Sequence, residues 1–319
     1  MILVTGGTGF IGRHLVQELV RLGMPVRALV RDRTRAALLP PLVDIVPGDL
    51  RDARALADAV SGARAVVHLA AQMDGPAIDE RTMAASNVDG TNALVRAVAD
   101  GSSAHVVYVS SAGVYGSRTV TEPLTETDEP RPATAYERSK LAAEEVVRSG
   151  VASWTVLRPS GVFGPWRSHT EAFLRTVGTR SVWLYAGPDT LLNPAYVNDV
   201  VAAIVFSLDR PGARRELINV GGPRVVSHRQ LVDVAAAALG RSVRHVRVPS
   251  ALTRPGASVL QRLWTAAGRR APARVSHLAH PVINRAISAD KARGLGIPST
   301  PLEEAMAQTV ERMRAERRL

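Results

Sequence analysis

Short apolar runs alternate along the first half of the chain with longer stretches in which apolar residues recur every three or four positions. The apolar runs cover residues 2–5, 26–30, 43–46, 65–71, 105–111 and 153–159. Helical spacing is clearest after the first run, where Leu15, Val16 and Leu19 fall on one side. Strands that alternate with helices predict parallel β-α-β units, with helices on both faces of one sheet. The pattern therefore predicts an α/β fold of the Rossmann type, with a doubly wound parallel sheet.

The alternation stops after the sixth apolar run, and glycines and prolines break up residues 161–194. A helix is predicted over residues 196–208, with a cap at Asn198 or Asp199. The expected division is into a Rossmann-type domain of residues 1–160 and about 195–220, and a smaller C-terminal α/β subdomain of about 161–194 and 221–319.

The composition is that of an ordinary globular protein, with 46% hydrophobic and 22% charged residues in 319. The chain has no cysteine, which excludes disulfides, thiolate metal sites and cysteine nucleophiles. The first predicted strand begins at Ile2 and leaves no room for a signal peptide, and no apolar run is long enough to cross a bilayer. We expect a cytoplasmic protein.

The net charge of +11 raises the question of a nucleic-acid partner. A nucleic-acid surface clusters its basic residues on one element or interleaves them with exposed aromatics. Here the arginines are dispersed along the chain, with small groups such as Arg31 to Arg35. Neither nucleic acid nor a membrane is therefore an expected partner, although the charge attracts anionic ligands.

A glycine turn follows the first predicted strand directly. Its glycines have the spacing G-x-x-G-x-x-G, and with Gly7 they also satisfy G-x-G-x-x-G. Such a turn brings the backbone close to a pyrophosphate, and the helix N-terminus beyond it attracts the phosphates. The predicted dinucleotide contacts in this turn are Gly6, Gly9, Phe10, Ile11 and Gly12.

The end of the second strand bears on the choice between NAD and NADP. An enzyme that uses NAD usually places an acid there to bind the ribose 2′-hydroxyl. This chain has Val30, followed by Arg31 and Asp32. An arginine suits a 2′-phosphate, so Arg31 favours NADP, while Asp32 leaves NAD open.

The ends of the later strands supply the remaining cofactor positions. Asp49 and Leu50 are placed to meet the adenine, and Ala70 and Ala71 leave room for the ribose and nicotinamide. Pro159, at the end of the sixth apolar run, completes the predicted cofactor contacts.

Lysine occurs only twice among the 40 basic residues, at Lys140 and Lys291. Lys140 lies four residues after Tyr136, so the two side chains face the same side of a helix. A tyrosine in water has a pKa of about 10, and a nearby ammonium favours the phenolate and lowers that pKa. The pair therefore indicates a general acid/base site.

The chain resembles the extended short-chain dehydrogenase/reductase family in a series of motifs that occur in the family's order. These are T-G-G-T-G-F-I-G, G-D-L-R-D, H-L-A-A, N-V-D-G-T, Y-V-S-S-A-G-V-Y-G, Y-E-R-S-K and L-R-P-S-G-V-F-G-P. The family includes nucleotide-sugar epimerases and dehydratases, 3β-hydroxysteroid dehydrogenases and dihydroflavonol-type reductases. The resemblance covers nearly the whole chain and implies an NAD(P)-binding Rossmann domain with a smaller substrate-binding subdomain.

The resemblance also implies roles for individual residues. Tyr136 would be the catalytic acid/base, Lys140 its partner and a ligand of the nicotinamide ribose, and Ser111 the hydroxyl that holds the substrate oxygen. Ser110 is the competing serine, and alignment on A-G-V-Y-G favours Ser111. Asn87 is either similar to the family's helix-embedded asparagine that orders the site, or an ordinary amide on a helix surface.

Other polar residues receive no chemical role. His277 and His280 lack a nearby carboxylate cluster, so no metal site is predicted. His68 is interpreted as structural and Tyr115 as packing in the substrate loop, while Lys291 has no evident partner.

The motifs also discriminate among the family's reactions. Dehydratases carry an Asp-Glu pair where this chain has Ala112 and Gly113, and nucleotide-sugar enzymes often carry Arg-Asp-Phe where it has L-L-N-P-A. The stretch 251–284 resembles the lid of steroid- or flavonol-type members. The favoured function is NAD(P)-dependent interconversion of a ketone and a secondary alcohol on a small metabolite. The alternative is a nucleotide-sugar 4-epimerase with tightly bound NAD.

The expected partners are a small-molecule substrate and a second copy of the chain. Members of the family often form homodimers through two helices, which correspond here to residues 87–99 and 136–148.

Overall fold

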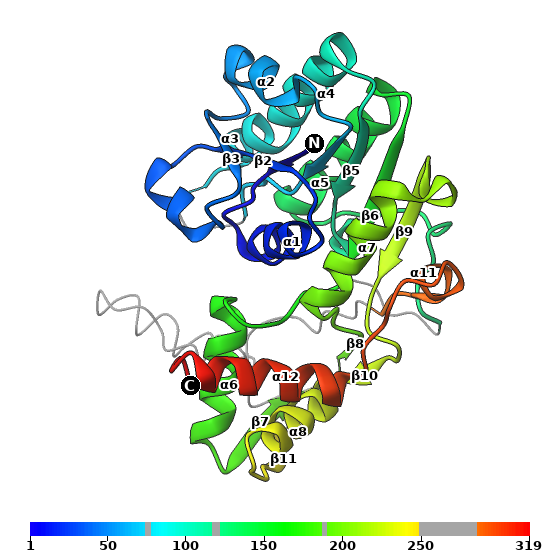
Figure 1. Cartoon of the computed structure of the whole chain (residues 1–319). Coiled ribbons are helices and arrows are strands. Elements are labelled where there is room, and N and C mark those ends of the chain that lie inside the picture. The colour runs from blue at the N-terminus through cyan, green and yellow to red at the C-terminus, as the bar shows by residue number, and fades with distance from the viewer. Residues whose placement is uncertain (74–77, 117–121, 187–189, 249–285) are drawn as a thin grey trace. The chain divides into compact units, whose positions relative to one another are not determined.

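The computed structural model describes residues 1–73, 78–116, 122–186, 190–248 and 286–319 (Figure 1). The described chain divides into two compact units. The first comprises Met1–Phe163, Asn193–Arg224 and Arg285–Pro301, and the second Gly164–Leu192, Val225–Asn284 and Leu302–Leu319, in each case without the residues outside the description.

The segment Arg285–Pro301 groups with the first unit, unlike in the expected division, which assigned it to the C-terminal subdomain. The reason is a set of contacts around Ile287. Its backbone bonds to the side chain of Asn193, and it forms a parallel bridge with Leu124.

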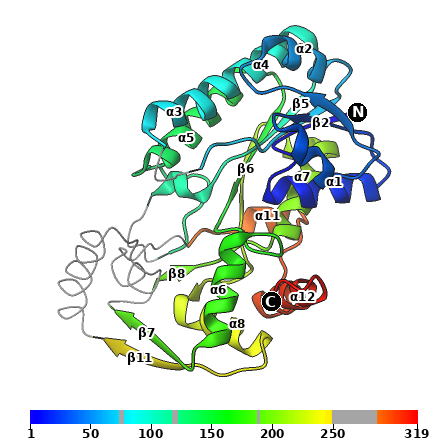
Figure 2. The ribbon, with the colours of Figure 1, turned by 90° about the vertical axis from the view of Figure 1, so that its left-hand side faces the viewer.

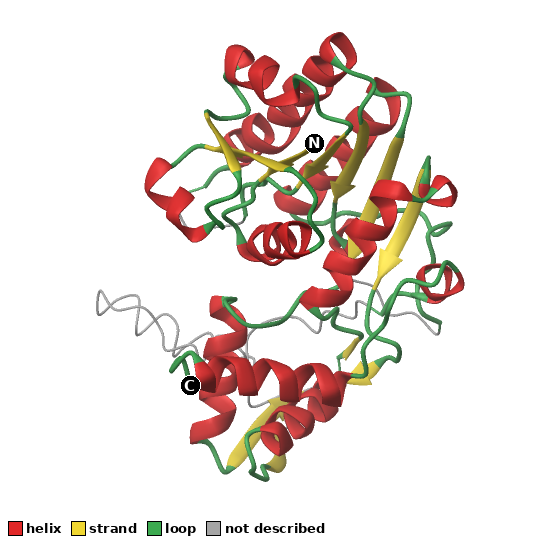
Figure 3. Ribbon diagram, viewed as in Figure 1, coloured by secondary structure: helices red, strands yellow, loops and turns green. Residues whose placement is uncertain are grey.

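The first unit is built on a parallel sheet of seven strands in the order β3-β2-β1-β4-β5-β6-β9 (Figure 3). The strands are β1 (Ile2–Thr5), β2 (Val26–Val30), β3 (Asp44–Pro47), β4 (Ala65–His68), β5 (His105–Val109), β6 (Trp154–Pro159) and β9 (Glu216–Val220). The strand order reverses between β1 and β4, and ligands of such sheets bind beyond the carboxyl ends of the strands at this point. The predicted Rossmann-type fold is confirmed.

Helices cover both faces of this sheet (Figure 2). Ile2 and Val4 face α1 (Phe10–Arg21) and α7 (Val197–Asp209), in one apolar core. Leu3 points to the other face, where α2 (Ala53–Val60), α4 (Gly90–Gly101) and α5 (Ala135–Gly150) pack. The shorter helical segments are η1 (Arg33–Leu38), α3 (Glu80–Ala84), η2 (Ala85–Asp89), η3 (Ala112–Tyr115), η4 (Pro211–Ala213) and α11 (Asp290–Gly294). β1 is buried on both faces, which explains why its run is apolar throughout.

The predicted cap of α7 is wrong. The chain stays extended up to Tyr196, which pairs with Phe163, and the helix begins directly afterwards with no side-chain cap. Asp199 therefore lies inside the first turn of α7. Its carboxylate accepts hydrogen bonds from the backbone N–H and the hydroxyl of Thr300, at 2.8 and 2.6 Å.

The second unit contains three helices and two small sheets in the part of it that the structure describes. The helices are α6 (Ser168–Thr179), α8 (His228–Ala238) and α12 (Leu302–Ala315). Strand β7 (Val182–Ala186) pairs in parallel with β11 (Arg244–Val248), and β8 (Leu191–Leu192) pairs antiparallel with β10 (Val226–Ser227). α12 buries the apolar stripe of Leu302, Met306, Val310 and Met313.

Within the described ranges, none of the helices combines the length and the apolar character that a membrane span requires.

Candidate active site

The turn between β1 and α1 is built from glycines that leave no room for side chains. Gly6 has a φ of +70°, and a Cβ there would lie 2.6 Å from the backbone nitrogen of Ala70. A Cβ on Gly12 would overlap the carbonyl oxygen of Gly6. No side chain caps α1 at Gly9, and the bond from Arg13 N–H to Gly9 O begins the helical pattern. Close backbone approach and a helix N-terminus together fit the pyrophosphate of a dinucleotide.

Phe10 and Ile11 form the start of α1, directly after the glycine turn, and both are half-buried. The Phe10 ring packs edge-on against His14 at 5.6 Å, and Ile11 packs against the core that α1 shares with α7. Their positions are those predicted, and their contact with a cofactor stays a prediction.

The loop after β2 places charged residues next to the glycine turn. Arg31 is exposed. The Asp32 carboxylate accepts hydrogen bonds from the Thr34 hydroxyl and backbone N–H at 2.6 and 3.0 Å, which caps η1 and lowers the pKa of Asp32. Arg35 folds back and donates to Thr8 O in the glycine turn at 3.0 Å. The carboxylate is thus engaged within its own turn, and an arginine that was not predicted lies against the glycine turn.

Asp49 and Leu50 follow β3, as predicted. The Asp49 carboxylate forms an ion pair with the Arg51 guanidinium at 2.9 Å, and the Arg51 side chain holds the pKa of Asp49 below its usual value. Leu50 packs against Gly90 at the start of α4, where a Cβ would lie only 3.0 Å from that of Leu50. Both residues lie beyond the carboxyl end of β3, and their contact with a cofactor stays a prediction.

The loop after β4 contains Ala70 and Ala71 and is held by Asn87. The Asn87 side chain accepts from Gln72 N–H at 2.6 Å and donates to Gln72 O at 3.0 Å. It also donates to Ser139 Oγ of α5 at 2.9 Å. Asn87 is 2% exposed and lies in the π-helical turn η2. Of the two interpretations, the ordering role is the one that fits, and a surface amide is excluded.

His68 is a neutral structural side chain. Its ring nitrogens lie 2.6 Å from Thr5 Oγ1 and 2.9 Å from Thr91 Oγ1. Burial, with a contribution from the charge of Lys140, lowers the pKa of His68 to about 3. The imidazole therefore stays uncharged near neutral pH and does not act as an acid there.

Helix α5 carries Tyr136 and Lys140 one turn apart. A capping box starts the helix: the Thr134 hydroxyl accepts from Glu137 N–H at 3.2 Å, and the Glu137 carboxylate accepts from Thr134 N–H at 3.1 Å. The cap places Tyr136 in the first turn and Lys140 on the same side of the helix. Lys140 is 1% exposed, and its Nζ donates to Val109 O at 2.8 Å.

Lys140 is buried next to an aromatic ring. Its Nζ lies 4.2 Å from the centroid of the Tyr108 ring, a cation–π contact. Burial lowers the pKa of Lys140 to about 7, against the opposing effect of the negative Glu144. The amine therefore exchanges its proton near neutral pH, within one helical turn of the tyrosine.

The two serines after β5 have different surroundings, as their alternation predicts. Ser110 is buried and donates to the Glu144 carboxylate at 2.5 Å. Ser111 is half-buried, and its Oγ accepts from Gly113 N–H at 3.0 Å, which caps η3. Because this bond uses the Ser111 oxygen as acceptor, the hydroxyl proton can be donated to a substrate oxygen.

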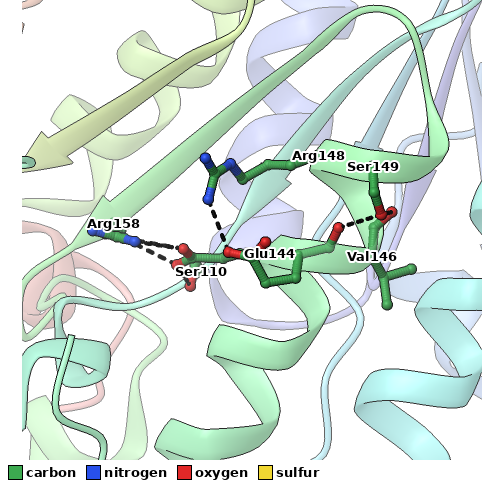
Figure 4. A network of polar contacts seen from close by, with 7 residues as sticks. Ser110, Glu144, Val146, Arg148, Ser149 and Arg158 are labelled. Carbon is green, nitrogen blue, oxygen red and sulfur yellow. Dashed lines mark hydrogen bonds and ion pairs between the residues drawn. The ribbon is translucent and has the colours of Figure 1, made fainter. Parts of the chain in front are cut away.

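Strand β6 ends in Arg158 and Pro159, both of them buried. Arg158 forms an ion pair with Glu144 of α5, with NH2 and Oε2 2.6 Å apart and the side chains 3% and 0% exposed (Figure 4). This pair was not predicted, because helical and strand spacing carry no signal for a contact between two elements.

Some residues without a predicted role have structural partners. Lys291 bonds to Glu216 Oε2 and to Leu217 O, both at 2.7 Å. Tyr115 is buried and donates to Asn219 Oδ1 at 2.9 Å. His277, His280 and the predicted lid 251–284 lie outside the described residues. Among the residues described, no three His, Asp or Glu side chains form a group that could bind a metal ion.

Comparison with known proteins identifies the family of the chain. The family model described as "NAD dependent epimerase/dehydratase family" matches residues 2–221. A ketoreductase of a farnesyl-dihydroquinoline oxide from Stigmatella aurantiaca is 28% identical over 91% of this chain and 89% of its own length. A 3-beta-hydroxysteroid dehydrogenase from Mycolicibacterium neoaurum is 28% identical over 96% and 89%. The structure of UDP-glucose 4-epimerase from Thermotoga maritima is 25% identical, with a TM-score of 0.76 over 99% of both chains.

The family match extends from β1 to the end of β9, and so includes every element that carries the predicted acid/base pair and the predicted cofactor contacts. On this evidence the chain is an enzyme of the NAD-dependent epimerase/dehydratase family, within the extended short-chain dehydrogenases/reductases.

Proposed function

We propose that this enzyme is an NAD(P)-dependent oxidoreductase that interconverts a ketone and a secondary alcohol on a small metabolite. The main support is Lys140, one of two lysines in the chain, which is 1% exposed one turn after Tyr136. Burying an amine is costly and needs a compensating contact. Here the contact is Val109 O, which fixes the nitrogen at the end of β5.

In this proposal Tyr136 moves the proton. It donates to the substrate oxygen in reduction and accepts from the alcohol in oxidation. Lys140 in its ammonium form favours the phenolate of Tyr136. An arginine is a poor replacement, because its bulky planar fork does not take the place of a compact ammonium with rotatable donors.

Ser111 would steady the substrate oxygen as charge develops on it. Its position at the end of β5 and its donor-competent hydroxyl support this role. Ser110, whose hydroxyl is committed to Glu144, is a poor candidate.

A nicotinamide cofactor supplies or accepts the hydride when it is bound. Gly6, Gly9 and Gly12 would hold its pyrophosphate against the start of α1. We favour NADP because Arg31 is exposed beyond β2 while the Asp32 carboxylate is engaged by Thr34. NAD is the alternative cofactor.

The stretch L-L-N-P-A favours a ketone over a nucleotide sugar as substrate. Where nucleotide-sugar enzymes often carry Arg-Asp-Phe, this chain holds Asn193, which is 2% exposed. Its amide donates to Ile287 O at 2.7 Å and accepts from Ile287 N–H at 3.1 Å. That side chain therefore braces the fold. Relatives that align over more than nine-tenths of the chain include a ketoreductase and a steroid dehydrogenase.

Positions 112 and 113 argue against dehydration. Ala112 and Gly113 are both buried, and a Cβ at Gly113 would lie 3.1 Å from Glu137 Cγ and 3.1 Å from Ser111 Oγ. A glutamate there would displace the proposed catalytic serine or the capping carboxylate.

A nucleotide-sugar 4-epimerase with tightly bound NAD is the second candidate, since the chain has the fold of a UDP-glucose 4-epimerase over 99% of its length. The test incubates the purified protein with ketones and NADPH, and separately with UDP- and GDP-sugars. Consumption of NADPH in proportion to alcohol formed is the expected result. Sugar inversion without added cofactor would contradict it.

We further propose that the enzyme is cytoplasmic and that it forms a homodimer through α4 and α5. Light scattering during gel filtration tests the homodimer, for which a mass near 68 kDa is expected from the 34.0 kDa chain. A mass of one chain would contradict it.

A further inference from the structure

A buried polar network runs beneath the proposed reacting residues, and none of its members belongs to them. The Glu144 carboxylate accepts from Ser110 Oγ at 2.5 Å and from Arg158 Nε and NH2 at 3.0 and 2.6 Å (Figure 4). Arg158 NH1 donates to the Tyr115 hydroxyl at 2.9 Å. That hydroxyl in turn donates to Asn219 Oδ1 of β9, also at 2.9 Å.

Three of its members lie within one peptide bond or about one helical turn of a residue of the proposed active site. Ser110 precedes Ser111, and Glu144 lies one turn of α5 after Lys140. Tyr115 ends the short helix η3 that Ser111 caps. The network thus ties α5, the end of β5, η3 and β6 together around Ser111.

Stability alone does not account for a charged pair at this place. Apolar side chains of the same volume usually stabilise a core as well as a buried ion pair does. Helix α5 already buries Ala143 and Val147 against the sheet. The ion pair adds a fixed geometry, because the Arg158 guanidinium holds the Glu144 carboxylate and the Tyr115 hydroxyl at set positions relative to each other.

We propose that Glu144 and Arg158 are positioning residues, which fix Ser110 on one side of Ser111 and Tyr115 on the other and so hold the Ser111 hydroxyl in place relative to Tyr136. This inference rests on the proposed role of Ser111. Neither residue of the pair touches the reacting atoms in this account.

The test uses the double variant Glu144→Leu with Arg158→Met, which removes both charges and keeps the apolar volume. A single substitution is unsuitable, because it leaves one buried charge unpaired. The matched control is Glu145→Gln, one residue further along α5, which breaks the exposed ion pair with Arg148.

The expected result is a separation of activity from folding. The double variant should keep its unfolding temperature within a few degrees and its NADPH affinity, measured by nicotinamide fluorescence, within about twofold. Its kcat should fall by about ten- to a hundredfold, as for a displaced catalytic group. The Glu145→Gln control should retain kcat. The inference would be overturned if kcat of the double variant stayed within about twofold of the unaltered enzyme. It would also be overturned if the decrease in kcat were no larger than the decrease in the fraction of folded protein.

Hydrogen exchange provides a readout that needs no substrate. The amides of Gly113 and Val114 bond to Ser111, and the amide of Gly116 bonds to Gly113 O. These amides should exchange at least tenfold faster in the double variant than in the control, and unchanged exchange would contradict the inference even if no ketone is reduced. Should the double variant not fold, Ser110→Ala decides by the same exchange measurement. An enzyme inactive on ketones would overturn the proposed function only.

Discussion

Lys140→Met offers a quantitative test of the burial of Lys140. Burial lowers the pKa of this amine to about 7 in the folded protein, whereas an unfolded chain has the ordinary value of about 10.4. Between these two values the unfolded chain binds more protons than the folded one. The free energy of unfolding therefore rises with pH across this window, and this gain is lost as the pH falls through the folded pKa.

The magnitude follows from integrating that difference. From pH 7.0 to pH 8.5 the folded amine goes from about half protonated to almost fully neutral, while the unfolded amine stays protonated. Integrated over this pH interval, the difference in protons bound by the unfolded and folded chains is about 1.2. At about 1.36 kcal/mol per proton and pH unit, this corresponds to about 1.6 kcal/mol of unfolding free energy. The unaltered protein should gain this much stability relative to Lys140→Met over the interval.

The assay is urea unfolding without cofactor at pH 7.0 and pH 8.5, for the unaltered protein, Lys140→Met and Lys291→Met. Lys291→Met is the matched control, because it removes the only other lysine, which is partly exposed and paired with Glu216. The free energy of unfolding of the unaltered protein minus that of Lys140→Met should rise by about 1.6 kcal/mol between the two pH values. A rise below about 0.5 kcal/mol, or one of equal size for Lys291→Met, would refute the reasoning on burial.

Three further predictions concern the site and its supports. Tyr136→Phe should abolish turnover and leave the dissociation constant of NADPH within about twofold in a fluorescence titration, because the phenol moves a proton and the glycine turn holds the cofactor; a variant that retains turnover would place the acid/base elsewhere. Arg31→Ala should raise KM for NADPH by about tenfold or more and leave KM for NADH unchanged, since the lost contact is to a 2′-phosphate. Arg33 is also exposed in this loop, and Arg33→Ala should change neither KM. An equal effect of Arg31→Ala on both cofactors would argue against a 2′-phosphate contact. Asn193→Ala should cost about 2–4 kcal/mol of unfolding free energy in urea, because it strands both backbone groups of Ile287, and a cost below about 1 kcal/mol would show that those bonds are replaced.

Local sequence patterns were sufficient to predict the sheet, the glycine turn and the Tyr136–Lys140 pair. Each depends on a pattern within one element: an uninterrupted apolar run in β1, glycine spacing before α1, and a four-residue step in α5. The backbone rule that strand ends carry ligand contacts then places Asp49 and Ala70 at one edge of the sheet.

Contacts between elements could not be predicted in this way. Glu144 and Arg158 meet only because α5 packs over the ends of β5 and β6. Asp199 looked like a helix cap, but the bridge between Phe163 and Tyr196 moves the helix start and directs that carboxylate to Thr300. In each case the partner is set by the tertiary packing, which the periodicity of either segment does not encode.

The most direct test of the proposed reaction follows a labelled hydride. The enzyme is incubated with a ketone and with NADPH that carries deuterium at C4, prepared as each of the two stereoisomers. We predict that one stereoisomer alone transfers its deuterium to the carbinol carbon, with one alcohol formed per NADPH consumed, and that Tyr136→Phe transfers none. Inversion of a sugar hydroxyl with no loss of NADPH and no deuterium in the product would contradict the account.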